Sequence, residues 1–326
     1  MAIGNTTQYG SRTALDQKFA PGFEDAVYRN NQLLGMTVNG KALFPESSIA
    51  PYGADYRWTL NSAGNTSAAI FTEGAAAGTP VAQTYVNLTA TPVYFWAWVR
   101  LSGHVRDAIR NGGAKPGLNP AANEFVAGFA DIADLMNTTF MGSTYGLTQI
   151  VDSANTVFGV DQSSAAYHAA TETALGGVLT RAALTNISES SRDNDKGGNW
   201  SVALMAHNQI TNYTNLTGEP AASNSSIRVE LSTVGGGRLD LGPDPEAVSF
   251  QGRPLIGIGD FDDNTIVGLD TRQTRFGPNW ALKTARYFET RAHNKAGDDD
   301  VYELSTARAL VCHMVKYNWK LGTVTA

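Results

Sequence analysis

Phe71-Thr-Glu-Gly-Ala-Ala-Ala-Gly-Thr-Pro-Val-Ala-Gln-Thr-Tyr85 is a loop rich in glycine, alanine and threonine, with Glu73 as its one charged residue. Strand-like runs flank it, from Tyr56 to Leu60 and from Ala82 to Leu101, and the second run is rich in aromatic and β-branched residues. The loop has too few apolar side chains to bury a core of its own, so its ordering requires packing against something outside its own domain. We therefore predict a long β-arm that mediates assembly.

The composition is that of a soluble globular chain. Its 326 residues suggest two domains, and a hydrophobic content of 42% is enough for a sizeable core. Charged residues make up 17% of the chain, below the ~25% typical of globular proteins, which leaves neutral and apolar surface for protein contacts. The net charge of -6 and the absence of any run of Lys and Arg argue against a reader of nucleic acid.

The single cysteine, Cys312, excludes an intrachain disulfide and any metal site built from several cysteines. Because it lies in an apolar run, we expect it to be buried as a small hydrophobic residue. The N-terminal residues lack the basic and apolar regions of a signal peptide, and the chain has no run of ~18 apolar residues. We therefore expect a chain that folds in a cytoplasm, without export and without a membrane.

A long helix is predicted to begin at Asn119-Pro120, because Asn caps free N–H groups and Pro tolerates the first helical position. The residues that follow place apolar side chains at i, i+4, i+7, i+11 and i+15, on one helical face. The helix would end at Met141-Gly142, after about twenty residues. The stripe consists of Phe125, Phe129, Ile132, Met136 and Phe140.

The other elements are predicted from shorter patterns. A short helix is expected over 102–110, and a second helical region over 162–190 with an interruption at Gly176-Gly177. Residues 200–207 suggest a buried strand leading into a short helix, and residues 214–250 a surface excursion. Strands are expected over 250–259 and 265–269 and over much of 300–325, although part of that last segment also fits a helix.

Few residues suggest chemistry. Gly257-Ile-Gly259 begins like a dinucleotide fingerprint, but the third glycine and the following helix are absent, as are a phosphate loop and a nucleophile elbow. Glu73 is a lone carboxylate in a loop that offers no burial to raise its pKa. We expect no catalytic residue and no cofactor.

A metal site is not expected either. The acidic clusters Asp260, Asp262, Asp263 and Asp298, Asp299, Asp300 lack the spacing of a calcium loop and suggest solvated turns. The histidines are scattered without a metal-binding motif, so each is expected to be structural. They are His104, His168, His207, His293 and His313.

The order of these patterns resembles the major capsid proteins of tailed bacteriophages, which have the Hong Kong-type capsid fold. Each piece is short, and their shared order across about 280 residues carries the resemblance. The matching segments are Glu73-Gly74 and Pro80 in the extended loop, the aromatic strand Val93–Ser102, a spine helix Asn119–Gly142 running into Gly146-Leu147, Gly252–Gly257, Gly268-Leu-Asp270, and the terminal run from Ala307 through Gly322.

The resemblance implies an α+β fold with an N-terminal arm at 1–45 and a peripheral domain at 46–160. That domain would hold the extended loop at about 56–92 and the spine helix at 119–142. An axial domain would occupy 161–274, the chain would return to the peripheral domain at 275–310, and 311–326 would supply closing strands of the axial domain. Assembly contacts are expected from Glu73, Gly74, Thr79, Pro80, Gln83 and Tyr85.

The implied function is a major capsid protein that forms pentamers and hexamers of an icosahedral shell around double-stranded phage DNA, without sequence readout. It would assemble in the host bacterial cytoplasm and reside in the virion, with a portal protein as partner and with a separate scaffolding protein or none. The shell would be stabilised by non-covalent contacts or by a decoration protein. A scaffolding segment within the chain is not expected, because the sequence starts at Met1 with no room for one. Residues 61–92 contain no lysine, so cross-linking through the loop is not expected.

Two alternatives remain at the level of sequence. An encapsulin-type nanocompartment shell has the same fold and would be distinguished by a groove that binds cargo peptides. A cytoplasmic α/β enzyme would instead show a deep pocket with convergent polar groups.

Overall fold

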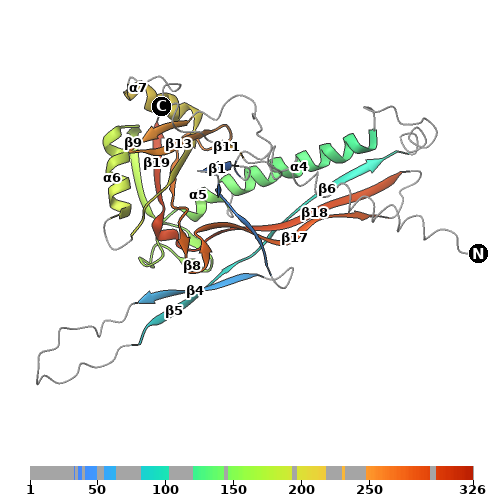
Figure 1. The fold of residues 1–326 in the computed structure, drawn as a ribbon, viewed down its shortest axis with the longest axis horizontal. Coiled ribbons are helices and arrows are strands. Elements are labelled where there is room, and N and C mark those ends of the chain that lie inside the picture. The colour runs from blue at the N-terminus through green and yellow to red at the C-terminus, as the bar shows by residue number, and fades with distance from the viewer. Residues whose placement is uncertain are drawn as a thin grey trace, which may run out of the picture.

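The computed structural model describes residues 33, 36–38, 41–49, 55–63, 82–102, 120–142, 146–192, 197–217, 230–231, 247–293 and 299–325. The chain is built from a four-stranded and a six-stranded sheet with one long helix, α4, running beside them (Figure 1). Helices and strands are mixed rather than alternating, which confirms the predicted α+β class. None of the described helices is long and apolar enough to cross a bilayer.

The four-stranded sheet has the order β3-β17-β18-β6, in which only the β3–β17 pair is parallel. Its strands are β3 (Glu46–Ser48), β17 (Trp280–Ala292), β18 (Asp300–Cys312) and β6 (Val93–Leu101). Helix α4 (Pro120–Gly142) packs on one face, where the rings of Phe95 and Phe140 lie 5.5 Å apart. All five residues of the predicted apolar stripe are buried, so the helix and its orientation are confirmed.

Gly128 allows α4 to approach this sheet closely. A Cβ at this position would lie 2.9 Å from Cγ2 of Val99 and 3.0 Å from Cδ1 of Leu304. A side chain here would therefore push the helix away from β6 and β18, which explains a glycine in the middle of a long helix despite its low helix propensity.

The six-stranded sheet has the order β12-β13-β10-β14-β19-β9. Its strands are β12 (Ala247–Phe250), β13 (Arg253–Ile258), β10 (Val202–Ala206), β14 (Ile266–Leu269), β19 (Trp319–Thr325) and β9 (Thr171–Val178). Helices α6 (Arg181–Arg192) and α7 (His207–Thr217) cover one face, and the core shared with α4 covers the other (Figure 1). Strand β10 is buried on both faces, as the sequence predicted for 200–207.

The helical region predicted over 162–190 is wrong in its first part. Residues 171–178 form β9, an edge strand that pairs in parallel with β19, and the helix α6 begins only at Arg181. The partner strand lies about 150 residues further along the chain, so no local pattern reports this pairing. Strand β17, which pairs along most of β18, was likewise not assigned from the sequence.

The arm is a two-stranded antiparallel ribbon of β4 (Tyr56–Ala63) and β5 (Thr84–Ala90), which projects away from both sheets (Figure 1). The two flanking strands are therefore confirmed. The predicted strand from Ala82 to Leu101 is interrupted at Thr91-Pro92, since Pro lacks the N–H that would continue a ladder. After this break the chain enters the four-stranded sheet as β6.

The remaining elements are short. They are β1 (Met36–Val38), β2 (Lys41–Ala42), β7 (Thr156–Val157), β8 (Val160–Asp161), β11 (Glu230–Leu231), β15 (Gln273–Thr274), β16 (Gly277–Pro278), α5 (Leu147–Ile150) and η2 (Val315–Tyr317). Several predictions fall outside the described residues: most of the N-terminal arm, the loop tip with Glu73, Gly74, Thr79 and Pro80, the helix after Ser102, His104 and Asp298.

Candidate assembly surfaces

The base of the arm is fixed to the body by an aromatic cluster. Trp58 of β4 is 5% exposed, and its ring centroid lies 4.9 Å from that of Phe158 and 5.6 Å from that of His313. Its Nε1 donates to the carbonyl of His313 at 3.3 Å. The Tyr56 hydroxyl lies 3.0 Å from His313 Nε2. The arm therefore leaves the body from a rigid, buried root.

Two neutral histidines lie at this root. Burial lowers the pKa of His313, and its Nδ1 lies 2.7 Å from the Pro278 carbonyl, which requires Nδ1 to carry the proton and Nε2 to accept from Tyr56. Burial lowers the pKa of His168 to about 4, and neither of its ring nitrogens has a hydrogen-bond partner. The hydrogen-bond partners of the His313 ring are the Tyr56 hydroxyl of the arm and the Pro278 carbonyl of the body, so this histidine joins the arm to the body.

Of the six predicted contact residues, only Gln83 and Tyr85 lie within the described residues. Tyr85 is 55% exposed on β5, and its hydroxyl donates to Gln83 Oε1 at 2.6 Å. Tyr85 pairs with Asn61 near the outer end of the ribbon, and Gln83 directly precedes β5, whereas Tyr56 at the root pairs with Ala90. Their proposed role in contacts remains a prediction.

A second exposed surface lies on the four-stranded sheet, on the face opposite α4. Tyr94, Trp96 and Trp98 of β6 are 53%, 56% and 49% exposed, whereas Phe95 and Val99 point to the other face of the strand and pack under α4. We call these three exposed side chains the aromatic face. The sequence predicted an aromatic strand here but not this division, because every residue from 93 to 99 is apolar and the alternation carries no polar signal.

Polar and charged side chains border the aromatic face. The Arg286 guanidinium lies 5.7 Å from the Tyr94 ring centroid, and the His293 ring lies 4.6 Å from that of Trp98. His293 Nε2 in turn lies 2.8 Å from a carboxylate oxygen of Glu303. An apolar centre with a polar rim is the usual anatomy of a protein–protein contact surface.

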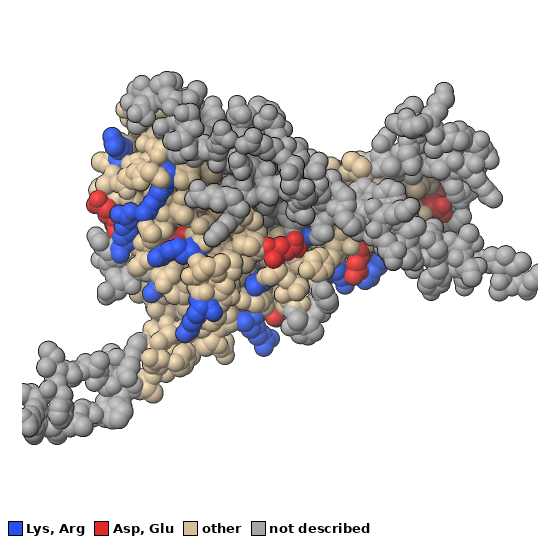
Figure 2. Space-filling view, viewed as in Figure 1, with Lys and Arg blue, Asp and Glu red and all other residues tan. Residues whose placement is uncertain are grey.

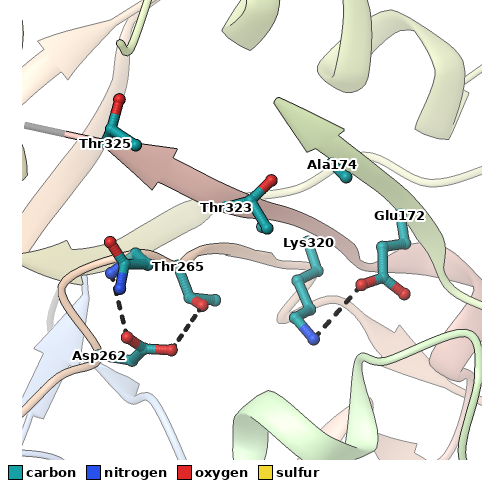
Figure 3. A pocket seen from close by; sticks show the side chains of 9 residues that line it. Glu172, Ala174, Asp262, Thr265, Lys320, Thr323 and Thr325 are labelled. Carbon is teal, nitrogen blue, oxygen red and sulfur yellow. Dashed lines mark hydrogen bonds and ion pairs between the residues drawn. The ribbon is translucent and has the colours of Figure 1, made fainter. Parts of the chain in front are cut away.

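A polar pocket of about 470 Å³ lies between β9, β19 and the turn before β14 (Figure 3). Lys320 Nζ lies 2.6 Å from Asp152 Oδ2 and 3.4 Å from Glu172 Oε1, and Asp262 accepts from Thr265 Oγ1 at 2.8 Å. Burial acts to raise the pKa of Asp152, but hydrogen bonds from Lys320 and the Ala154 N–H hold it below its usual value.

Lys320 is thus held between Asp152 and Glu172, while Asp262 is held by hydrogen bonds from its own turn. Within the described ranges, no group of three or more His, Cys, Asp or Glu residues is placed to hold a metal ion. Gly257 lies inside β13 beside the ring of His207, not at a strand-to-helix turn that could hold a dinucleotide. Cys312 is fully buried as predicted, and burial raises the pKa of its thiol.

No family model matches the sequence, and no curated protein matches it. Solved structures do match the fold over most of the chain. A cyanophage A-1(L) capsid asymmetric unit has a TM-score of 0.63 at 15% identity, covering 87% of this chain and 92% of that one. A structure from Mycobacterium phage Bobi has a TM-score of 0.56 at 10% identity, covering 91% and 94%.

An encapsulin complex from Synechococcus elongatus has a TM-score of 0.54 at 12% identity, covering 86% of this chain and 85% of that one. Identities this low show the fold alone. The chain therefore has the Hong Kong-type capsid fold, as its sequence patterns predicted, and the fold is one that shell proteins share.

Proposed function

We propose that this chain is the major capsid protein of a tailed bacteriophage. Copies would assemble as pentamers and hexamers into an icosahedral shell that encloses double-stranded phage DNA. The observation that carries the proposal is the β4–β5 arm, which projects from a body whose fold matches a phage capsid asymmetric unit over 87% of the chain (Figure 1).

The arm is suited to bridging copies because its root is held rigidly by the body, while the ribbon beyond the root is only marginally stable. A two-stranded ribbon without a third strand or a helix is barely stable alone in water. The root is locked by Trp58, while Tyr85 further out is largely exposed. Packing on a neighbouring copy would supply the apolar contacts that the ribbon lacks, through Gln83, Tyr85 and the loop residues Glu73, Gly74, Thr79 and Pro80.

The aromatic face supports the same proposal. Three large aromatic side chains exposed side by side on one strand are unusual for a monomer, and such patches commonly mark protein contacts. The bordering arginine and histidine side chains would remain at the rim of the contact. We therefore assign this face to the shell interfaces.

The wider assignments belong to the same proposal. The four-stranded sheet with α4 would form the peripheral domain and the six-stranded sheet the axial domain, with the boundaries stated from the sequence. The portal, a separate scaffolding protein and a decoration protein would be the partners, and assembly would take place in the host bacterial cytoplasm. The absence of lysine between residues 61 and 92 supports a shell held by non-covalent contacts.

An encapsulin-type shell is the second candidate, because the fold also matches an encapsulin complex over 86% of this chain. The two functions differ in what the shell contains, a genome or a cargo protein. The ion pairs that hold Lys320 between Asp152 and Glu172 support a structural role for the polar pocket in either case.

Electron microscopy with light scattering would test the proposal, on the protein expressed alone and with the products of its neighbouring genes. We expect closed shells, or free pentamers and hexamers. A chain that stays monomeric or dimeric under every condition would refute it, and shells that enclose a cargo protein and never DNA would favour the encapsulin alternative.

A shortened arm gives a sharper test. Replacing residues 64–83 with a two-residue Asn-Gly turn joins Ala63 to Thr84, which are already paired across the ribbon. Assembly should fail while the body stays folded. The six tryptophans all lie outside the replaced segment, so their fluorescence reports the body fold as a control.

A further inference from the structure

Basic side chains gather at one end of the six-stranded sheet, although the sequence has no run of them. Figure 2 shows Lys and Arg side chains spread over the lobe built on this sheet, with few acidic side chains among them. Strand β13 begins, and the antiparallel strand β14 ends, at this end of the sheet. We call the group the basic end, and it consists of Arg192, Arg253, Arg272 and Lys316; Arg272 and Lys316 both lie over the Tyr317 ring, and Arg253 lies close enough to Arg192 and Arg272 to feel their charge.

The centre of the basic end is held rigidly. Arg272 Nε donates to both carboxylate oxygens of the fully buried Asp270 at 2.9 Å, and Arg272 Nη2 donates to the Gly197 carbonyl at 2.7 Å. The Arg253 guanidinium lies 4.8 Å from the Trp200 ring centroid, and its Nη2 donates to Asn199 at 2.5 Å. These cations are therefore fixed in position before any partner arrives.

Among the described residues, one carboxylate pairs with the basic end. Asp270 pairs with Arg272, and the other three cations form no ion pair within the described part of the chain. Arg253 Nη1 is buried without a hydrogen-bond partner. Burial, together with the positive charges of Arg192 and Arg272, lowers the pKa of Arg253.

The opposite end of the same sheet carries the opposite charge. The turn between β13 and β14 holds Asp260, Asp262 and Asp263, and residues 259–266 contain no Lys or Arg. Asp260 accepts from Asn137 Nδ2 at 3.2 Å, Asp262 accepts from the Asn264 N–H at 3.0 Å, and none of the three forms an ion pair within the described ranges. We call this turn the acidic end.

We infer that the basic end of one copy docks on the acidic end of the next copy around a ring. The inference rests on the proposed shell function. A closed ring requires two different, complementary surfaces on every subunit, and the two ends of this sheet provide such a pair. Complementary charge also steers the encounter and suppresses misdocked arrangements. The alternative, a nucleic-acid surface, is less favoured because Arg272 is already committed to Asp270 and Arg253 is partly buried.

Charge reversal tests the pairing. One variant carries Arg192→Glu and Lys316→Glu, a second carries Asp260→Lys and Asp263→Lys, and a third carries all four changes. Each of the first two should raise the protein concentration needed for assembly on the order of 100-fold, because like charges then face each other. The third should return to within about 10-fold of the unaltered chain, because both surfaces are inverted together.

Controls separate the pairing from general effects of charge. Arg181→Glu and Glu124→Lys change exposed charges outside both ends and should leave assembly unchanged. Thermal melting of every variant reports whether it folds. A folded third variant that fails to recover, or single-surface variants that assemble like the unaltered chain, would overturn the inference and leave the shell proposal intact.

Two further outcomes are decisive. If the unaltered chain never assembles, the shell proposal fails and this inference fails with it. If the Arg192→Glu, Lys316→Glu variant assembles normally but loses retention of a double-stranded DNA fragment at low salt, the basic end binds nucleic acid, and the pairing is wrong.

Discussion

Acidic pH should lower the free energy of unfolding through His168, because the folded chain offers its ring neither water nor a hydrogen-bond partner. Its ring is fully buried beside the arm root, 6.5 Å from the ring centroid of Phe158, and both ring nitrogens lack hydrogen-bond partners. Burial lowers its pKa from 6.5 to about 4. The unfolded chain therefore binds a proton at this residue below about pH 6.5, while the folded chain resists it down to about pH 4.

The sign and size of the effect follow from this difference. Because the unfolded state binds more protons between these two values, the contribution of His168 to the free energy of unfolding is constant above about pH 6.5 and falls as the pH drops toward 4. At about 1.4 kcal/mol per pH unit, His168 should cost about 2 kcal/mol at pH 5 and about 3 kcal/mol at pH 4.

Urea unfolding of unassembled subunits, followed by tryptophan fluorescence at pH 7.5 and pH 5, would measure this cost. His168→Leu and His168→Gln both remove the titrating group, so each should lose about 2 kcal/mol less than the unaltered chain over this interval. Only His168→Leu should also be more stable at pH 7.5, by about 1 to 3 kcal/mol, because Gln again buries polar atoms without partners.

Contributions from other titrating groups, including His313, are present in all three chains and cancel in the comparison. The reasoning would be refuted if the unaltered chain and His168→Leu lost the same stability between pH 7.5 and pH 5. A hydrogen-bonded or solvated imidazole would give that result.

Three other predictions follow from packing. Gly268→Ala should lower the free energy of unfolding in the urea titration by about 3 kcal/mol, because the new Cβ would lie 2.0 Å from the buried Trp319 ring. Gly322→Ala on the adjacent strand is the control. The atom nearest to its Cβ is 4.0 Å away, so this change should alter the free energy of unfolding by under about 0.5 kcal/mol. Trp58→Ala should release the arm root at a local cost of about 3 to 5 kcal/mol, seen as faster hydrogen exchange in β4 and β5 with α4 unchanged; equal acceleration in α4 would contradict it. The Cys312 thiol should resist a thiol reagent at pH 8 until urea unfolds the chain, since it is fully buried, and modification of the native chain would show that the site opens.

Local patterns predicted the elements that carry their own signal. The apolar stripe from Phe125 to Phe140 determined both α4 and the face it buries, because side chains three and four residues apart share a helical face. The arm strands were predicted because aromatic and β-branched runs flank a loop that cannot bury itself. The order of such segments along the chain was enough to indicate the capsid-type fold.

Local patterns could not predict which distant segments pair with each other. Residues 171–178 were predicted to be helical but form β9, because a strand's stability comes from its partner, here β19 near the end of the chain. The aromatic face also depends on a distant segment. Successive side chains of β6 point to opposite faces of the sheet, and the packing of α4 on one face covers Phe95 while Trp96 on the other stays exposed.

The sequence by itself therefore determined the long helix and the arm, because both depend on residues close together in the chain. Only the tertiary structure decided where charge accumulates. Arg192, Arg253 and Lys316 are far apart in sequence, and three separate chain segments, α6, β13 and η2, bring them to the same end of one sheet. Electrostatic energy depends on distance through space, so a chain with a net charge of -6 and no basic run still builds a basic end.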